Sequence, residues 1–177
     1  MKHQLALTEN VSFRDEHPAA GDSREEILAG LAQAQKVINP KFFYDQRGSE
    51  LFDKITRLPE YYPTRTEIGI LSSNSQEIAD ACGSGCLFIE PGSGSCEKAR
   101  LLLDALRPTA YVPIDISADF LRDAAIQLGR EYPWLRIHAV CADFNHSWSF
   151  VEGLPAGKRV IFYPGSTIGN LEPEAAE

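Results

Sequence analysis

The sequence predicts an α/β protein in which a parallel, doubly wound sheet follows an N-terminal helical region. Two observations predict this fold. Beyond residue 84, short apolar runs end in acidic or glycine-rich segments, and helical patterns separate the first three runs. Before residue 84, apolar residues recur at helical spacing. The chain has 177 residues, of which 44% are hydrophobic and 24% charged, so it can bury one core.

Residues 1–21 are polar and aperiodic, which predicts a flexible N-terminal arm. Residues 22–83 predict a helical cap region, with helices over 23–38, 49–57 and 64–81. The first and third helices begin with Ser23-Arg24-Glu25-Glu26 and Thr64-Arg65-Thr66-Glu67. Both segments have the capping-box pattern, in which a hydroxyl and a glutamate three residues later bind free N–H groups. Gly83 is a typical residue to end the last helix.

Residues 84–177 predict a partial Rossmann-like domain. Strands are expected over 86–90, 111–115, 135–140 and 159–163, and helices over 97–106 and 117–131. The sequence stops inside what looks like the start of a further helix, and four strands are few for this architecture. The fourth strand would leave an open hydrophobic edge. We therefore expect a sheet truncated after its fourth strand, whose edge is covered by a missing C-terminal half or by self-association.

The composition excludes several classes of function. Acidic residues outnumber basic ones 25 to 17, for a net charge of −8, which argues against binding to nucleic acids or anionic membranes. No apolar run approaches the roughly 20 residues that span a bilayer, and the N-terminus has no signal-peptide pattern, so a cytoplasmic protein is expected. The four cysteines and four histidines have no zinc-site spacing, so no protein-bound metal is expected.

A glycine-rich loop follows the first strand and precedes a helix. In Glu90-Pro91-Gly92-Ser93-Gly94, the glycines allow a ligand to approach the backbone closely, which makes Gly92 and Gly94 candidate cofactor-binding residues. The dinucleotide fingerprint requires a third glycine where this chain has Glu97, which disfavours a nicotinamide-dependent oxidoreductase. A turn that merely connects strand and helix is the alternative interpretation.

Acidic residues also end the next two strands. Asp115 could accept both hydroxyls of a ribose, and Asp143 could accept from an adenine amino group beside the ring of Phe144. Each acid alone could instead cap a helix. Together with Glu90 at the same sheet edge, they favour an adenosine ligand without a diphosphate. S-adenosylmethionine fits this description.

Aromatic residues cluster upstream of the sheet, with Tyr44, Phe52 and Tyr61 as the candidates for contact with a ligand. Aromatic faces attract a sulfonium or a quaternary amine. The alternative is the core of a small helical cap. The loop from Gly165 to Asn170 could add small residues, hydroxyls and an amide near the donor, or it could simply form a turn.

Five motifs resemble, in the same order, those of the histidine-specific S-adenosylmethionine-dependent methyltransferases, over about residues 22 to 175. The motifs begin at Phe43, Leu58, Glu90, Tyr111 and Pro164: FYDQRGSELFD, LPEYYPTRTE, EPGSGS, YVPIDIS and PGSTIGN. The resemblance implies a class I methyltransferase fold with a helical substrate region. It also implies S-adenosylmethionine as the methyl donor and methylation of the α-amino group of histidine to hercynine, in ergothioneine biosynthesis.

The resemblance also implies roles for individual residues. The donor contacts would be Gly92, Lys98, Asp115, Asp143 and Phe144, and the substrate pocket would comprise Tyr44, Phe52, Tyr61, Gly165 and Asn170. Tyr61 and Asn170 would hold the amino and carboxylate groups of the amino acid. As catalytic residues, Tyr44 and Asn170 would orient the neutral amine.

Two departures from the family pattern leave alternatives open. Pro91 stands where the family usually has an aliphatic residue, and the family chain continues beyond residue 177 to close the imidazole pocket. An N-methyltransferase for another amino acid, such as tryptophan, is therefore one alternative. A non-catalytic, truncated module that binds S-adenosylmethionine or a partner is the other.

Overall fold

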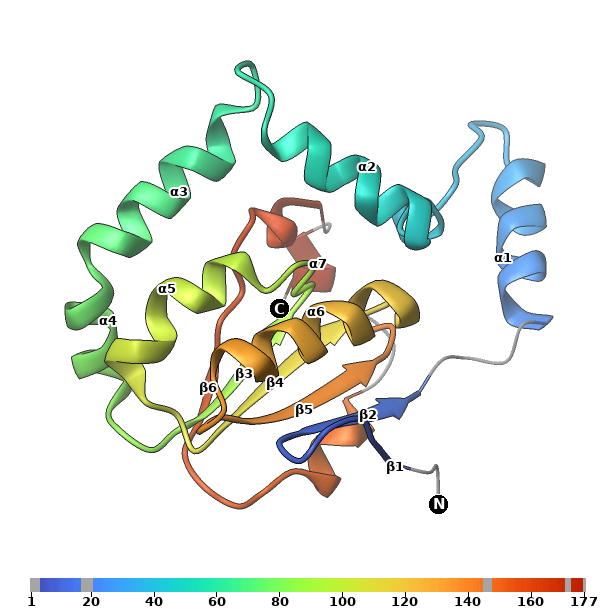
Figure 1. Ribbon diagram of the computed structural model, residues 1–177. Coiled ribbons are helices and arrows are strands. Elements are labelled where there is room, and N and C mark those ends of the chain that lie inside the picture. Colours follow the sequence, from blue (N-terminus) through green and yellow to red (C-terminus); the bar gives the residue numbers. More distant parts are fainter. Residues whose placement is uncertain (1–3, 17–20, 145–147, 171–172, 177) are drawn as a thin grey trace.

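The computed structural model describes residues 4–16, 21–144, 148–170 and 173–176. Six strands form one sheet in the order β1-β2-β5-β4-β3-β6 (Figure 1). The strands are β1 (Gln4–Ala6), β2 (Val11–Asp15), β3 (Leu87–Pro91), β4 (Ala110–Asp115), β5 (Arg136–Cys141) and β6 (Arg159–Ile161). Among these described strands, only the pairing of β1 with β2 is antiparallel. The predicted α/β class with a parallel sheet is confirmed.

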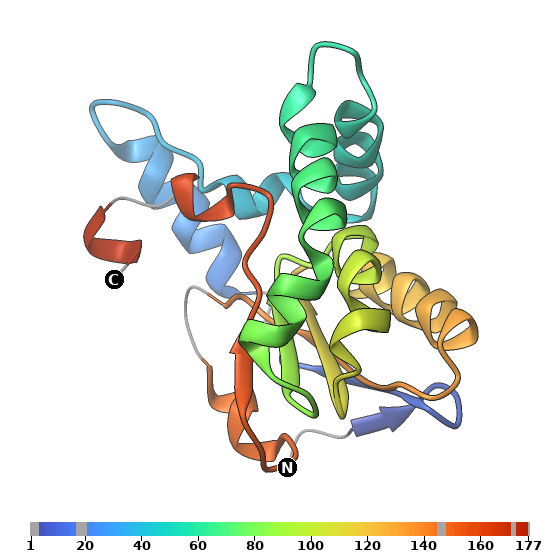
Figure 2. The same ribbon diagram turned by 90° about the vertical axis from the view of Figure 1, so that its left-hand side faces the viewer.

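The α-helices are α1 (Gly21–Ala32), α2 (Gln46–Thr56), α3 (Tyr62–Ser73), α4 (Ser75–Cys82), α5 (Glu97–Leu106), α6 (Ala118–Glu131) and α7 (Pro173–Ala176). Three 3-10 helices are η1 (Pro40–Phe43), η2 (Ser149–Gly153) and η3 (Thr167–Asn170). Helices α2 and α3 form an arch beyond one end of the sheet, while α5 and α6 lie against one of its faces (Figures 1 and 2). None of the described helices is long and apolar enough to cross a membrane.

The core has two layers, because side chains alternate between the faces of each strand. On the helical face, Phe88 and Tyr111 pack with buried leucines of α5 and α6, such as Leu103 and Leu128. This layer includes Leu71 of α3, which joins the cap region to the sheet. On the other face, buried residues of β3, β4 and β5 pack against side chains of the segment after β5, including Val151 and Leu154.

The prediction of a flexible arm over residues 1–21 is wrong for β1 and β2. These strands form a hairpin, and β2 extends the sheet by pairing in parallel with β5. Val11 and Phe13 alternate with polar residues and are buried. The side chain of Asn10 donates hydrogen bonds to the carbonyl oxygens of Gly129 and Leu135, at 3.0 Å each. The hydrophobic alternation and the anchoring amide together explain why this segment is ordered.

Two helices of the cap region end earlier than predicted. Helix α1 ends at Ala32 rather than at residue 38, because the chain turns back and the Val37 amide binds the Gly30 carbonyl oxygen at 3.2 Å. The single helix expected over 64–81 is two helices, α3 and α4, separated at Asn74. The Asn74 side-chain amide donates to the Ile70 carbonyl oxygen at 2.7 Å and thereby ends α3. Helix α4 ends at Cys82 with Gly83 as its C-cap, in agreement with the prediction that Gly83 ends this helical segment.

The strand β6 forms one edge of the sheet, as the sequence predicts for its fourth strand. It pairs with β3 through its residues Arg159 to Ile161. Ile161 is 59% exposed, so an apolar side chain lies uncovered at this edge in the described part of the chain.

Candidate functional site

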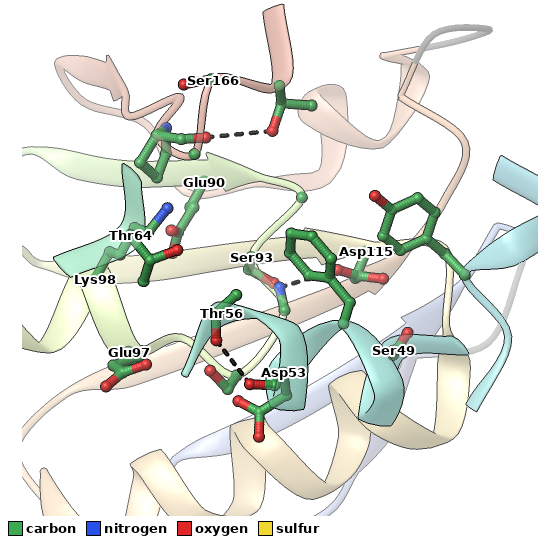
Figure 3. A pocket seen from close by; sticks show the side chains of 18 of the residues that line it. Ser49, Asp53, Thr56, Thr64, Glu90, Ser93, Glu97, Lys98, Asp115 and Ser166 are labelled. Atoms are coloured by element: carbon green, nitrogen blue, oxygen red, sulfur yellow. Dashed lines mark hydrogen bonds between the residues drawn. The ribbon is translucent and has the colours of Figure 1, made fainter. Parts of the chain in front are cut away.

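A cavity of about 660 Å³ lies at the carboxyl ends of β3, β4 and β5. Its lining combines the glycine-rich loop after β3, residues of α2 and α3, and the loop after β6. This volume is within the range of about 300–1,000 Å³ that is typical of small-molecule sites. Figure 3 shows Asp53 and Thr56 on α2 and Ser93 and Asp115 at the sheet end, all among the residues that line this site.

The glycine-rich loop has a conformation that glycines permit. Gly92 and Gly94 have φ values of +68° and +51°, in the left-handed region. The amide of Ser93 donates to the Ile114 carbonyl oxygen at 3.0 Å, which fixes the loop against β4. A Cβ atom at Gly94 would meet nothing within 4 Å, so the backbone there is open to a ligand.

Asp115 ends β4 and is held by the backbone on both sides. Its Oδ2 atom accepts from the Gly94 amide at 2.9 Å, and its Oδ1 atom accepts from the Ser117 amide at 3.0 Å. Burial raises the pKa of Asp115, while these backbone hydrogen bonds oppose the rise. Each oxygen retains a lone pair for a ligand, so this fixed carboxylate could accept two hydroxyl groups.

Asp143 follows β5, and a lysine binds it. The Lys41 Nζ atom lies 3.0 Å from Asp143 Oδ2 and 2.7 Å from Glu26 Oε2. Burial disfavours the charge on Lys41, but hydrogen bonds to Glu26 and Asp143 outweigh it and raise the pKa of Lys41. The neighbouring Phe144 contacts Tyr163 edge-to-face, with ring centroids 6.0 Å apart. The proposed adenine position therefore borders an ion pair that links it to α1.

The aromatic residues of the cap region form a connected cluster. The ring of Phe52 in α2 lies 5.8 Å from that of Tyr44 and 6.1 Å from that of Tyr61, both edge-to-face. The Asp45 side chain accepts from the Gly48 amide at 2.7 Å and so begins the helix that carries Phe52. Burial, then the neighbouring Tyr61 and Asp115, raises the pKa of Tyr44, which keeps its hydroxyl protonated at neutral pH.

Glu90 ends β3 and is 1% exposed. The Tyr111 hydroxyl donates a hydrogen bond to its Oε2 atom. Burial raises the pKa of Glu90 to about 8, although the Tyr111 hydrogen bond and the positive charge of Lys98 oppose the rise. Figure 3 shows Glu90 and Lys98 close together in the site. Nearby, Ser93 is 7% exposed, and its hydroxyl oxygen has no hydrogen-bond partner within the described residues.

Glu67 of α3 binds two other parts of the site. Its Oε2 atom lies 2.5 Å from Lys98 Nζ in α5, and its Oε1 atom accepts from the Gly165 amide at 2.8 Å. All three residues line the cavity.

The structure brings nearly all the predicted site residues to one cavity. Its lining includes Tyr44, Phe52, Tyr61, Gly92, Gly94, Lys98, Asp115, Asp143, Phe144 and Gly165. Asn170 ends η3, but its side chain lies outside the described part of the chain. The sequence motifs predict no site role for Lys41, Glu67 or Ser93. Glu67 is the fourth residue of a capping-box pattern, which predicts a helix cap and gives no sign of its contacts with Lys98 and Gly165.

Comparison with known proteins adds independent findings. The model of the family "Histidine-specific methyltransferase, SAM-dependent" matches residues 23–177. Histidine N-alpha-methyltransferase of Mycolicibacterium smegmatis is 48% identical over 159 residues, or 88% of this chain and 49% of that protein. Its Mycobacterium tuberculosis counterpart is 48% identical over 155 residues, or 85% of this chain and 47% of that protein.

A fungal relative matches a smaller share of its own length. Ergothioneine biosynthesis protein 1 of Neurospora crassa is 34% identical over 134 residues, or 72% of this chain and 15% of that protein. The chain spans about half the length of the two mycobacterial relatives.

Proposed function

Because the chain belongs to the family of histidine-specific, S-adenosylmethionine-dependent methyltransferases, we propose that its cavity binds S-adenosylmethionine and histidine for methylation of the histidine α-amino group. One observation carries the proposal: the strand-end acids Asp115 and Asp143 line the same cavity as the aromatic side chains of Tyr44, Phe52 and Tyr61. The product would be hercynine, an intermediate of ergothioneine biosynthesis.

The chemistry of the cavity fits such a donor. Asp115 presents a fixed carboxylate to a ribose, and Gly94 leaves the backbone open beside it. The buried hydroxyl of Ser93 lacks a partner among the described residues and suits a polar ligand atom. Lys98, 19% exposed at its side chain, can bind the carboxylate of the methionyl part. Asp143 and Phe144 would hold the adenine.

When bound, S-adenosylmethionine supplies a sulfonium methyl group, whose bond to sulfur breaks as a bond to the amine nitrogen forms. The residues of this chain would act chiefly by orientation, which can lower a barrier by several kcal/mol. Tyr61 and Asn170 are proposed to hold the amino and carboxylate groups of histidine. The hydroxyl of Tyr44, kept protonated, can accept from the amine and direct its lone pair.

The aromatic cluster would also stabilise the positive charges of the donor and of the methylated amine. The edge-to-face rings of Tyr44, Phe52 and Tyr61 form one wall of the cavity. Aromatic faces attract cations by about 0.5–2 kcal/mol, which suits both a sulfonium and an amine that becomes quaternary. This wall therefore favours repeated methylation of one nitrogen.

A methyl-transfer assay tests the proposal. The chain is incubated with S-adenosylmethionine and histidine, and mass spectrometry follows the masses of mono-, di- and trimethylated histidine. We expect methylated histidine, and less of it with Asp115→Asn. No methylated tryptophan is expected when tryptophan is offered at the same concentration. Methylation of tryptophan alone would assign a different acceptor. Donor binding without any transfer would favour the non-catalytic module.

A further inference from the structure

Glu67 makes two contacts that join three elements of the site. It lies in α3 of the cap region, and its two carboxylate oxygens bind different partners. One oxygen forms the 2.5 Å ion pair with Lys98 of α5, and the other accepts the 2.8 Å hydrogen bond from the Gly165 amide after β6. A single side chain therefore connects the cap region, helix α5 and the loop that leads into η3.

These contacts are partly shielded from water. The side chains of Lys98 and Glu67 are 19% and 28% exposed. Gly165 has a φ of +83°, and a Cβ atom there would lie 2.9 Å from Lys98 Nζ, so the glycine leaves room for the ammonium group. The Lys98 ammonium group thus lies against the loop, in space that the side chain of any residue other than glycine at position 165 would occupy.

The ion pair leaves Lys98 able to bind a ligand. An ammonium group has three N–H donors, and Glu67 occupies one of them. A lysine side chain that is already ordered avoids the rotamer entropy that a free one loses on binding, which is worth about 3- to 10-fold in affinity. Glu67 therefore improves the site without contacting the ligand through its own oxygens.

We infer that Glu67 is a positioning residue that orders Lys98 for the carboxylate of the donor. Through Gly165, Glu67 also aligns the loop from Gly165 to Asn170, where histidine would bind, with the bound donor. This inference rests on the proposed function and identifies how the two halves of that site are coupled. It assigns Glu67 to a role that its capping-box position in the sequence conceals.

The test compares two ligands that differ at the end that Lys98 would bind. S-adenosylhomocysteine carries the amino-acid carboxylate, whereas 5′-methylthioadenosine lacks it. Calorimetric titration of Glu67→Gln is expected to show about 3- to 10-fold weaker binding of S-adenosylhomocysteine and a less than 2-fold change for methylthioadenosine. A general structural defect would weaken both ligands equally, and that result would overturn the inference.

A matched control removes an ion pair elsewhere on α5. Arg100 Nε lies 2.8 Å from Glu131 Oε2 of α6, and neither residue lines the cavity. Glu131→Gln should leave the affinity for both ligands unchanged. Thermal unfolding of both variants verifies that each remains folded.

A second readout needs no ligand. The glutamine oxygen of Glu67→Gln can still accept from the Gly165 amide, whereas Glu67→Ala removes the acceptor. Hydrogen exchange at Gly165 should therefore remain slow in Glu67→Gln and become at least 10-fold faster in Glu67→Ala. Equal exchange in both variants would contradict the loop contact. Failure of the unaltered chain to bind either ligand would instead refute the proposed function and this inference with it.

Discussion

Glu90 gives a prediction about stability because its carboxyl group is fully enclosed. Its pKa rises from the usual 4.5 to about 8, chiefly through burial. The native state therefore holds a proton that the unfolded chain releases above pH 4.5. The contribution of this group to the free energy of unfolding is fully present below pH 4.5 and is lost as the pH rises towards 8.

The magnitude follows from the linkage between pKa and stability. At about 1.4 kcal/mol per pH unit, Glu90 should lower the free energy of unfolding by about 3 to 4 kcal/mol between pH 5 and pH 8. Glu90→Gln retains an oxygen that accepts from the Tyr111 hydroxyl, but it does not titrate. The variant should therefore lack this part of the pH dependence and exceed the unaltered chain in stability at pH 8.

Urea unfolding followed by circular dichroism at pH 5, 6, 7 and 8 measures both chains. The difference between their free energies of unfolding isolates Glu90, because all other titrating groups are shared. Parallel curves across this range would refute the reasoning, since they would mean that Glu90 has the same pKa in both states. A variant more stable at pH 5 than at pH 8 by the full amount would also contradict it.

Three further changes test other parts of the site. Asp115→Asn places a donor against one of two backbone amides and should weaken S-adenosylhomocysteine binding about 10- to 100-fold by calorimetry, the loss expected for a charged hydrogen bond; unchanged affinity would argue against a ribose at this carboxylate. Tyr61→Phe should weaken histidine binding about 3- to 10-fold and spare S-adenosylhomocysteine, and equal losses of both would contradict its assignment to the amino acid. Lys41→Met removes the ammonium that bridges Glu26 and Asp143, so hydrogen exchange in α1 should accelerate while that in α5 does not change; unaltered exchange in α1 would show that the bridge does not hold this helix.

The sequence predicts that the strand-end acids meet at one edge of the sheet, because the pattern is local and the geometry of parallel strands is general. An apolar run that ends in an acid is visible residue by residue, and the carboxyl ends of parallel strands meet at one edge. Asp115 and Asp143 are expected at this edge from the sequence, and both line the cavity. Helix α5 also has the predicted bounds, Glu97–Leu106, since a glycine-rich loop and Arg107-Pro108 delimit it.

Where the sequence predicts a residue's role wrongly, that role depends on contacts with distant parts of the chain. Glu26 and Glu67 both occupy the fourth position of a capping box, yet Glu26 binds Lys41, and Glu67 binds Lys98 and Gly165. A carboxylate can form an ion pair or cap a helix, and which of the two it does depends on the residues that the fold brings near it. Helix α3 accordingly begins at Tyr62, where Pro63 in the first turn suits a helix start without a side-chain cap.

The N-terminal hairpin shows the same limit for strands. Residues Val11 to Asp15 alternate over too short a stretch to distinguish a strand from a polar arm. Their order depends on pairing with β5, which lies more than 120 residues later in the chain. A partner at that separation leaves no trace in a local pattern.

The proposed function requires that one cavity holds the methyl donor and histidine together. Calorimetric titration of the chain with S-adenosylhomocysteine, alone and with saturating histidine, tests this requirement directly. We expect binding in both titrations and a tighter complex when histidine is present. Binding that histidine leaves unchanged would contradict a shared site, and no binding of S-adenosylhomocysteine would contradict the donor site itself.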